Sequence, residues 1–154
     1  MDEALSLRLP PGVRIQAYAD DLVLTKTGQI GNTIQRDLQN ACSILVKWGQ
    51  SVKLEFASAK SELIIFSKKR AKLDLLININ GTQILPSPTV KYLGVVLDEK
   101  LSWKAHVEQK CRATTRAIMD LRRFSKLTWG PSKHILERIY LSIAEPMLLY
   151  AAPI

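Results

Sequence analysis

Apolar and polar positions along the first two thirds of the chain follow the period of β-strands. Successive strand residues point to opposite faces, so alternation marks a half-buried strand and a continuous apolar run marks a more deeply buried one. The pattern predicts two short strands within 13–26, and one strand each over 52–56, 63–66, 75–79 and 90–97. Asn80-Gly81 is a strong signal for a two-residue hairpin, with Ile84-Leu85 beginning the return.

Helical periodicity appears once between these strands and dominates the last third of the chain. Spacings of three and four predict a first helix through Ile34, Leu38, Ala41, Leu45 and Trp48, ending at Gly49. A second helix, capped by Ser102, has an expected apolar face of Trp103, Val107, Cys111, Thr114, Ile118, Leu121 and Phe124. After Gly130-Pro131, a last helix is expected along Ile135, Ile139, Ile143 and Met147, with a kink at Pro146.

These elements predict an α+β fold in two parts. Residues 1–98 combine antiparallel strands with one packed helix, and residues 99–154 are all-helical. The chain has 154 residues, 47% of them hydrophobic, which is enough for one domain or two small ones with a real core.

The charge balance favours an anionic partner. Lys and Arg number 22 against 14 Asp and Glu, a net charge of +8. Nine of these basic residues and only four of the acidic ones lie in 101–154, so most of the excess belongs to the helical part. Nucleic acid is the commonest partner of a chain with this balance.

Cysteine usage and hydropathy indicate an intracellular protein. Cys42 and Cys111 form no CxxC pair, and the two histidines do not complete a zinc set, so two reduced, buried thiols are expected. The second and third residues are acidic, unlike the basic start of a signal peptide. No apolar run approaches the roughly 18 residues of a membrane span, so no membrane partner is expected.

Two adjacent aspartates, Asp20 and Asp21, interrupt the apolar residues of 13–26. Neighbouring strand residues face opposite ways, so a turn is expected between or beside them, at the tip of a buried hairpin. A carboxylate there is costly unless water, a cation or a hydrogen bond compensates it, and Mg²⁺ prefers carboxylate oxygens. The alternative is an ordinary turn in which aspartate bonds the backbone, although the Gly or Asn of a tight hairpin is absent.

Tyr18-Ala19-Asp20-Asp21 between apolar strands resembles the YxDD hairpin of reverse transcriptases. Three later segments are similar, in order and spacing, to the polymerases of non-LTR (LINE-type) retrotransposons. Residues 54–69 resemble that family's strand, loop lysine and strand, residues 90–107 its primer-grip hairpin running into the thumb, and residues 135–154 the end of the thumb. The resemblance covers essentially the whole chain. It implies that 1–98 is the C-terminal half of a polymerase palm and that 99–154 is a helical thumb segment.

The resemblance also implies roles for individual residues. Asp20 matches the metal-binding aspartate and Asp21 the second, less directly involved one, with Mg²⁺ as the cofactor. Tyr18 matches the residue near the primer terminus, and Lys60 the lysine that would protonate or neutralise the departing pyrophosphate. The plain alternative for Lys60 is a solvated loop lysine. Leu93-Gly94 matches the tip of the primer grip, where a glycine allows close approach of a nucleic-acid strand or forms a bulge.

The second expected helix carries cations suited to contacting the phosphates of a template–primer duplex without reading sequence. They are Lys104, Lys110, Arg112, Arg116, Arg122 and Arg123. Acidic residues on this helix are few, namely Glu108 and Asp120. The alternative is an ordinary solvated helix face.

The implied activity is nucleotide addition to a primer 3′ end by two-metal phosphoryl transfer. Its partners are an RNA template, a DNA primer and nucleoside triphosphates. Only two acidic residues, Asp2 and Glu3, precede the hairpin, so the fingers and the upstream palm aspartate are expected to be missing and the chain alone to be inactive. Ala57 replaces a common Asn of the family, and Gln50-Ser51-Val52 a Gly-containing turn.

Two other interpretations compete with a polymerase fragment. A degenerate retroelement remnant would act at most as a basic nucleic-acid-binding module. A helical interaction protein would carry the ADD turn by accident, but it leaves the ordered set of segments unexplained.

Overall fold

The computed structural model describes residues 2–67, 74–124 and 130–152. The chain divides into two compact units, Met1–Pro88 and Thr89–Ile154. In chain order, the elements are α1 (Asp2–Leu5), β1 (Val13–Tyr18), β2 (Asp21–Lys26), α2 (Gly31–Ser51), the 3-10 helix η1 (Ser58–Lys60), β3 (Ile77–Ile79), β4 (Thr82–Ile84), β5 (Thr89–Tyr92), β6 (Val95–Asp98), α3 (Lys104–Phe124), α4 (Lys133–Ile139), the π-helix η2 (Tyr140–Ala144) and α5 (Glu145–Leu148). The expected α+β class is confirmed; the division falls before β5, whereas the expected palm–thumb boundary lay after residue 98.

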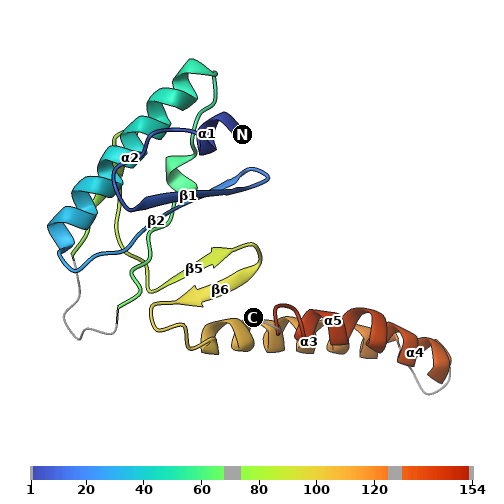
Figure 1. The fold of residues 1–154 in the computed structure, drawn as a ribbon. Helices are drawn as coiled ribbons and strands as arrows, with labels where there is room; N and C mark the ends of the chain where they lie inside the picture. The colour runs from blue at the N-terminus through green and yellow to red at the C-terminus, as the bar shows by residue number, and fades with distance from the viewer. Residues whose placement is uncertain (1, 68–73, 125–129, 153–154) are drawn as a thin grey trace. The chain divides into compact units, whose positions relative to one another are not determined.

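The first unit is built on α2, the long helix that the spacing of apolar residues predicted (Figure 1). Two antiparallel hairpins, β1–β2 and β3–β4, contribute the strands. The buried core consists of Ile34, Leu38, Cys42, Leu75 and Ile77, and Val13, Leu24, Leu63, Ile65 and Ile79 pack around it. One face of each strand therefore meets the helix, because alternation leaves the other face outside the core.

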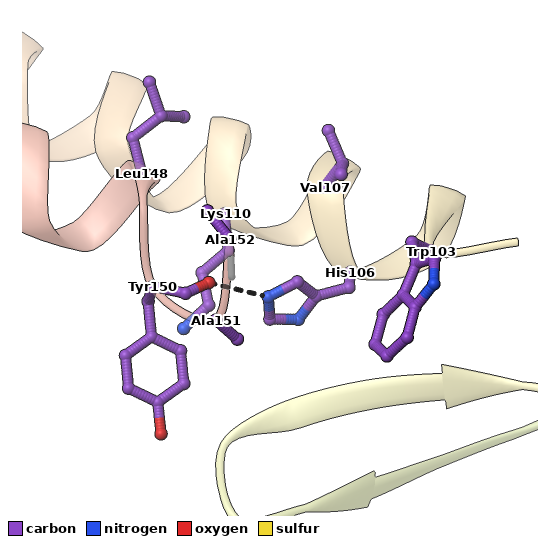
Figure 2. A pocket seen from close by; sticks show the side chains of 8 residues that line it. All are labelled: Trp103, His106, Val107, Lys110, Leu148, Tyr150, Ala151 and Ala152. Atoms are coloured by element: carbon purple, nitrogen blue, oxygen red, sulfur yellow. Dashed lines mark hydrogen bonds between the residues drawn. The ribbon is translucent and has the colours of Figure 1, made fainter. Parts of the chain in front are cut away.

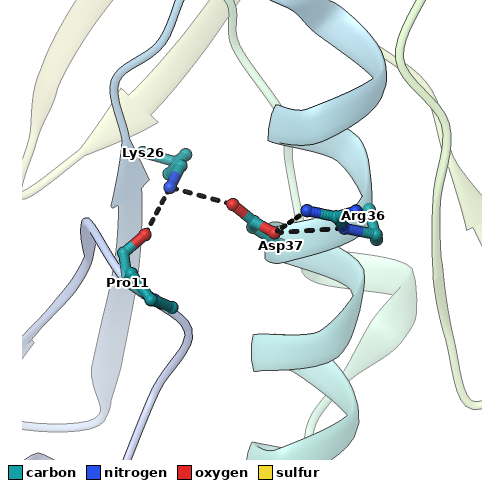
Figure 3. A network of polar contacts seen from close by, with 4 residues as sticks. All are labelled: Pro11, Lys26, Arg36 and Asp37. Carbon is teal, nitrogen blue, oxygen red and sulfur yellow. Dashed lines mark hydrogen bonds and ion pairs between the residues drawn. The ribbon is translucent and has the colours of Figure 1, made fainter.

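An ion pair joins the β1–β2 hairpin to α2 (Figure 3). Lys26, the last residue of β2, lies 2.9 Å from Asp37 Oδ2 and also donates to the carbonyl oxygen of Pro11. The two paired side chains are only 10% and 12% exposed, whereas Arg36, which also contacts Asp37, is 71% exposed. The hydrogen bond from Lys26 is the main cause that lowers the pKa of Asp37 below its ordinary value.

Glutamine side chains of α2 complete the hydrogen bonding of the strand beside them. The Gln39 amide donates to the carbonyl of Asn78 and accepts from its N–H, both at 2.8 Å, as a neighbouring strand would. One turn earlier, Gln35 accepts from the N–H of Leu76 at 3.4 Å. These bonds hold β3 on the helix through its backbone as well as through its apolar side chains.

Two of the expected strands in the first unit are wrong. Residues 52–56 are irregular, because the helix ends in a turn in which the N–H of Leu54 bonds to the carbonyl of Gly49. Lys53 takes the positive φ of 58° that usually falls to glycine at a helix end. Residues 63–66 form only an isolated bridge between Leu63 and Pro86, and they are half-buried or exposed.

The second unit contains the β5–β6 hairpin, α3, and the run α4–η2–α5, which packs back on α3. The single strand expected over 90–97 is in fact this hairpin. Ser102 does not cap α3 with its hydroxyl, which donates to Asp98 instead. The Asp98 carboxylate accepts the N–H groups of Lys100, Ser102 and Trp103, and the hydrogen bond from the Ser102 backbone is the largest cause lowering its pKa.

The packed face of α3 matches the expected one at Trp103, Thr114 and Leu121 but not at Val107, Cys111 and Ile118. Val107 is 54% exposed and Ile118 42% exposed, and Cys111 is also exposed. The side chains turned inward are Trp103, His106, Lys110, Ala113, Thr114, Ala117 and Leu121. Of the expected face, the side chain of Phe124 lies outside the described residues. Small side chains on α3 meet a last run whose buried residue, Ala144, is also small, which lets the helices approach.

The last expected helix is interrupted rather than kinked at Pro146. The π-helix η2 precedes Pro146, which stands in the first turn of α5. Ile135 and Ile143 of the expected face are exposed, and Ala144, next to Ile143 in η2, is buried instead.

Both cysteines are free, but only Cys42 is buried, so the expected burial of Cys111 is wrong. Among the described residues, no helix is long and apolar enough to cross a membrane.

We expect Lys26→Met to lower the stability of the first unit more than the double change Lys26→Met/Asp37→Leu, because the single change leaves the buried carboxylate with only its contact to the exposed Arg36. The measurement is amide hydrogen exchange in α2. The pKa of Asp37 is lower in the folded state than its ordinary value of 3.8. The ion pair therefore stabilises the fold at pH values above 3.8, and this contribution is lost as the pH falls through the folded-state pKa. Arg36→Met, at the exposed contact, is the control and should change little. Equal losses in the single and double variants would contradict a specific pair.

Candidate functional site

The two aspartates lie at the tip of the β1–β2 hairpin. Tyr18 and Asp21 are directly opposite each other as the last cross-strand pair, and Ala19 and Asp20 form the two-residue loop. Ala19 has a φ of 50°, the positive value that primed two-residue turns require at this position. A tight turn is thus present without Gly or Asn, and alanine bears the conformational cost.

Strand alternation separates an inner and an outer face of this hairpin. Residues Val13, Ile15, Ala17, Leu22, Leu24 and Lys26 share the inner face, which is turned to α2. Tyr18 and Asp21 share the outer face, and the Tyr18 side chain is 63% exposed. The expected buried tip is wrong, because Asp20 and Asp21 are both exposed.

The two carboxylates fit part of a magnesium site. Mg²⁺ usually takes one or two carboxylates and completes its coordination with water and substrate phosphates. Asp20 and Asp21 project from adjacent positions at an exposed tip, where phosphates have access. Within residues 2–67, 74–124 and 130–152, no group of three or more His, Cys, Asp or Glu side chains is placed to hold a metal. A metal ion at this tip would therefore need further ligands besides Asp20 and Asp21, and the metal role of the two carboxylates stays a prediction.

Lys60 belongs to the same unit as the aspartates but is not joined to them. It is exposed at the end of η1, whose Ser58 hydroxyl lies 3.1 Å from the hydroxyl of Thr82 in β4. In the part of the chain that the structure describes, no ion pair links Lys60 to Asp20 or Asp21. Its proposed role at the pyrophosphate stays a prediction.

Leu93 and Gly94 form the two-residue loop of the β5–β6 hairpin, with Tyr92 opposite Val95. The φ angles of 48° and 78° are both positive, as in a type I′ turn, so this is a tip and not a bulge. The Tyr150 hydroxyl donates to the carbonyl of Leu93 at 2.7 Å. A Cβ added at Gly94 would lie 3.0 Å from that hydroxyl, so glycine avoids both a strained backbone angle and a close contact here.

A buried histidine ties this hairpin to the end of the described chain (Figure 2). His106 is 5% exposed; its Nδ1 accepts the N–H of Val96, and its Nε2 lies 3.2 Å from the carbonyl of Tyr150. An acceptor at Nδ1 makes Nε2 the protonated nitrogen of a neutral ring. The Lys110 ammonium lies 4.0 Å from the centre of the Tyr150 ring.

The histidine and its neighbours surround a small open cavity of about 210 Å³. Its lining residues are Trp103, His106, Val107, Lys110, Leu148, Tyr150, Ala151 and Ala152. Most of this lining is apolar, and the polar groups of His106 and Tyr150 are engaged with each other. We therefore interpret the cavity as a gap in the packing around His106 and Tyr150, the residues that hold the β5–β6 hairpin.

The six expected phosphate-binding cations all lie on α3, and the structure divides them. Arg112 pairs with Glu108 and Arg123 with Asp120, in exposed ion pairs of 3.8 and 3.5 Å. Lys110 is turned inward over Tyr150. Lys104, Arg116 and Arg122 are exposed, and within the described ranges none of them has an ion-pair partner.

Sequence reasoning missed the residues that support these tips. Asp37 stands on the apolar face of α2 with Ile34 and Ala41, and a carboxylate on such a face signals a buried partner. His106 follows Trp103 by three residues, so it is likewise a polar side chain on an apolar helix face. No local signal marks Tyr150, because its partners lie far away in the sequence.

Gly94→Ala should destabilise the β5–β6 hairpin more than Gly81→Ala destabilises β3–β4. The φ of Gly81 is 82°, nearly that of Gly94, but nothing lies within 4 Å of its added Cβ, so Gly81→Ala isolates the conformational cost of about 1–2 kcal/mol. In Gly94→Ala, the new Cβ should in addition displace the Tyr150 hydroxyl and break its hydrogen bond to Leu93. Hydrogen exchange at the amides of β4 and β6 measures both. Tyr150→Phe should add little to Gly94→Ala, and full additivity would contradict the proposed contact.

Comparison with known proteins finds relatives among insect retrotransposons. The chain is 24% identical over 145 residues to a Retrovirus-related Pol polyprotein from type-1 retrotransposable element R1 3 of Nasonia vitripennis, with 91% of this chain and 38% of the relative covered. It is 25% identical over 152 residues to a Putative 115 kDa protein in type-1 retrotransposable element R1DM of Drosophila melanogaster, with coverage of 99% and 15%. It is 29% identical over 143 residues to the RNA-directed DNA polymerase from mobile element jockey of the same fly, with coverage of 90% and 15%.

The matches involve nearly all of this chain but less than two fifths of each of these relatives. No family model matches the chain, and no solved structure matches it. The sequence resemblance is thus supported at the level of the Pol proteins of non-LTR retrotransposons, to which this chain is similar and related.

Proposed function

We propose that this chain is the part of an RNA-directed DNA polymerase that carries the metal-binding hairpin, the primer grip and the thumb. The observation that carries the proposal is the solvent-exposed tip at which Tyr18, Asp20 and Asp21 lie together, in a chain similar to retrotransposon Pol proteins. The second tip, Leu93-Gly94, is a tight and supported hairpin, as a backbone surface that grips a nucleic-acid strand needs to be.

The chemistry is an in-line phosphoryl transfer from a nucleoside triphosphate to the 3′ hydroxyl of a DNA primer on an RNA template. A pair of Mg²⁺ ions, when bound, neutralises charge on the attacking and leaving oxygens. Asp20 would hold the metal directly and Asp21 would support it, while Tyr18 rests against the primer terminus. Lys60 would meet the departing pyrophosphate. A further aspartate and the fingers would come from other segments of the whole polymerase.

The exposed cations of α3 suit the other task of a thumb, which is to hold the duplex. Lys104, Arg116 and Arg122 face solvent without an ion-pair partner in the described chain, so they can meet phosphates without first breaking a contact. Contacts of this kind add affinity without sequence preference and are weakened by salt.

Asp20→Asn should abolish nucleotide addition in a chimera that joins this chain to the preceding part of the jockey polymerase, and Asp21→Asn should leave more activity. A neutral amide at position 20 loses the charge that holds the ion. In the isolated chain, Asp20→Asn should be at least as stable as the parent without metal, since one of two adjacent like charges is gone. Mg²⁺ should raise the melting temperature of the parent more than that of the variant.

The isolated chain, assayed for primer extension alongside, should be inactive. If Asp20→Asn unfolds the chain while the chimera tolerates it, the pair is a structural turn and the polymerase role is wrong.

The chain should bind a nucleic-acid duplex with a marked salt dependence. Each phosphate contact contributes a slope of about −0.9 to log K against log salt, so Arg116→Ala/Arg122→Ala should reduce the slope by about 2. Lys133→Ala/Arg138→Ala removes the same charge from α4 and is the matched control. Fluorescence anisotropy over a salt series measures both. Identical slopes for parent and α3 variant would exclude α3 as the duplex-binding helix.

A further inference from the structure

The outer face of the β1–β2 hairpin has an ordered composition that the proposed roles of its tip do not use. Three cross-strand pairs share this face, Arg14 with Thr25, Gln16 with Val23, and Tyr18 with Asp21. We name these six residues the outer strip. All of them are exposed except Val23, which is half-buried.

The outer strip is rich in hydrogen-bond donors that are not engaged with protein. Arg14 presents five donors, Gln16 two and Thr25 one. In the described part of the chain, no hydrogen bond or ion pair occupies these three side chains. The other cation of the hairpin, Lys26, is on the inner face and is held by Asp37. Arg14 is therefore the one hairpin cation whose charge faces outward.

The strip is also graded in charge. Its one carboxylate, Asp21, is at the tip beside the loop residue Asp20, and its cation, Arg14, is at the opposite end, four strand residues from Tyr18. At about 3.3 Å per residue this separation is about 13 Å. Arg, Gln, Thr and Tyr are all residue types that contact phosphates in nucleic-acid complexes. A primer strand needs donors along its phosphates and metal-binding carboxylates only where its 3′ end reacts, which is the order found along the strip.

We propose that the outer strip is a track for the backbone of the primer strand, with Arg14 bound to an upstream phosphate. This inference rests on the proposed function and extends it, because it fixes the direction in which the strand runs: its 3′ end lies at Tyr18 and Asp21, and its upstream part at Arg14. For a duplex whose axis runs parallel to the strip, a rise of 3.4 Å per nucleotide makes 13 Å correspond to about four nucleotides. Arg14 thus meets the phosphate about four nucleotides before the primer end.

The experiment couples one side chain with one phosphate. The probes are primer–template duplexes with a recessed primer 3′ end and a single neutral methylphosphonate at each of the last six linkages in turn. Binding to the 154-residue chain is measured by anisotropy for the parent, Arg14→Ala, Arg14→Lys and Lys47→Ala. Lys47 is an exposed cation on the side of α2 away from the packed hairpin, and its loss changes the net charge equally. Circular dichroism checks that each variant folds.

On an unmodified duplex, Arg14→Ala should bind more weakly and lose about 0.9 of salt slope, as for one phosphate. Arg14→Lys should keep the slope, and Lys47→Ala should match the parent apart from a small general charge effect. The decisive result is position-dependent coupling: the neutral linkage near the fourth nucleotide weakens the parent but leaves Arg14→Ala unchanged.

Three outcomes overturn the inference. They are equal sensitivity of parent and Arg14→Ala at every linkage, coupling at the terminal linkage instead of upstream, and an equal effect of Lys47→Ala. If Arg116→Ala/Arg122→Ala weakens binding while Arg14→Ala does not, the track is wrong and the thumb assignment stands. If the parent chain binds no duplex at all, both fail.

Discussion

The ion pair between Lys26 and Asp37 is the constraint on which the candidate site depends. A β-strand repeats every two residues, so a slip of one position would exchange the inner and outer faces of the β1–β2 hairpin. Burial of Val13 and Leu24 on the core already opposes such a slip, because the slip would turn the face that carries Arg14 inward. Lys26 adds a directional contact, because it reaches Asp37 and the carbonyl of Pro11 from the inner face. Tyr18 and Asp21 face outward as a consequence.

In the second unit, neutral polar groups hold the hairpin in place. His106 receives the N–H of Val96 at one nitrogen and reaches the carbonyl of Tyr150 with the other, so one ring joins β6 to the end of the described chain. Tyr150 then supports the Leu93-Gly94 tip through its hydroxyl. Each of these two hairpins is thus held by a buried polar side chain that comes from a helix, Asp37 for β1–β2 and His106 for β5–β6. A polar contact has a preferred direction, which makes it better suited than apolar packing to hold a loop in one place.

The sequence predicted those elements whose pattern lies within a few neighbouring residues, and it failed where the structure depends on residues far apart in the chain. The Asn80-Gly81 hairpin, the strands around the aspartates and the long helix through Ile34 and Leu45 follow from turn chemistry and periodicity, and each is confirmed. Residues 52–56 alternate like a strand but follow a helix end in which Lys53, not a glycine, adopts the positive φ. The face of α3 was misjudged because large apolar residues suggest burial, whereas Val107 and Ile118 are exposed and the smaller Ala113 and Ala117 are half-buried. The exposed tip and the outer strip required the register, which alternation alone does not give.

Ala19 explains how two like charges can occupy the tip. In the positive-φ conformation alanine costs about 1–2 kcal/mol relative to the usual regions, a cost that glycine would avoid. Glycine would also leave the loop free to sample many conformations, whereas alanine, once held there by the pairing of Tyr18 with Asp21, has few alternatives. A restrained loop keeps the Asp20 carboxylate near one position, and in the proposed function a metal ligand that is already positioned would lose less entropy when an ion and phosphates arrive. The strain at Ala19 and the pair at Lys26 therefore act toward the same end, one at each end of strand β2.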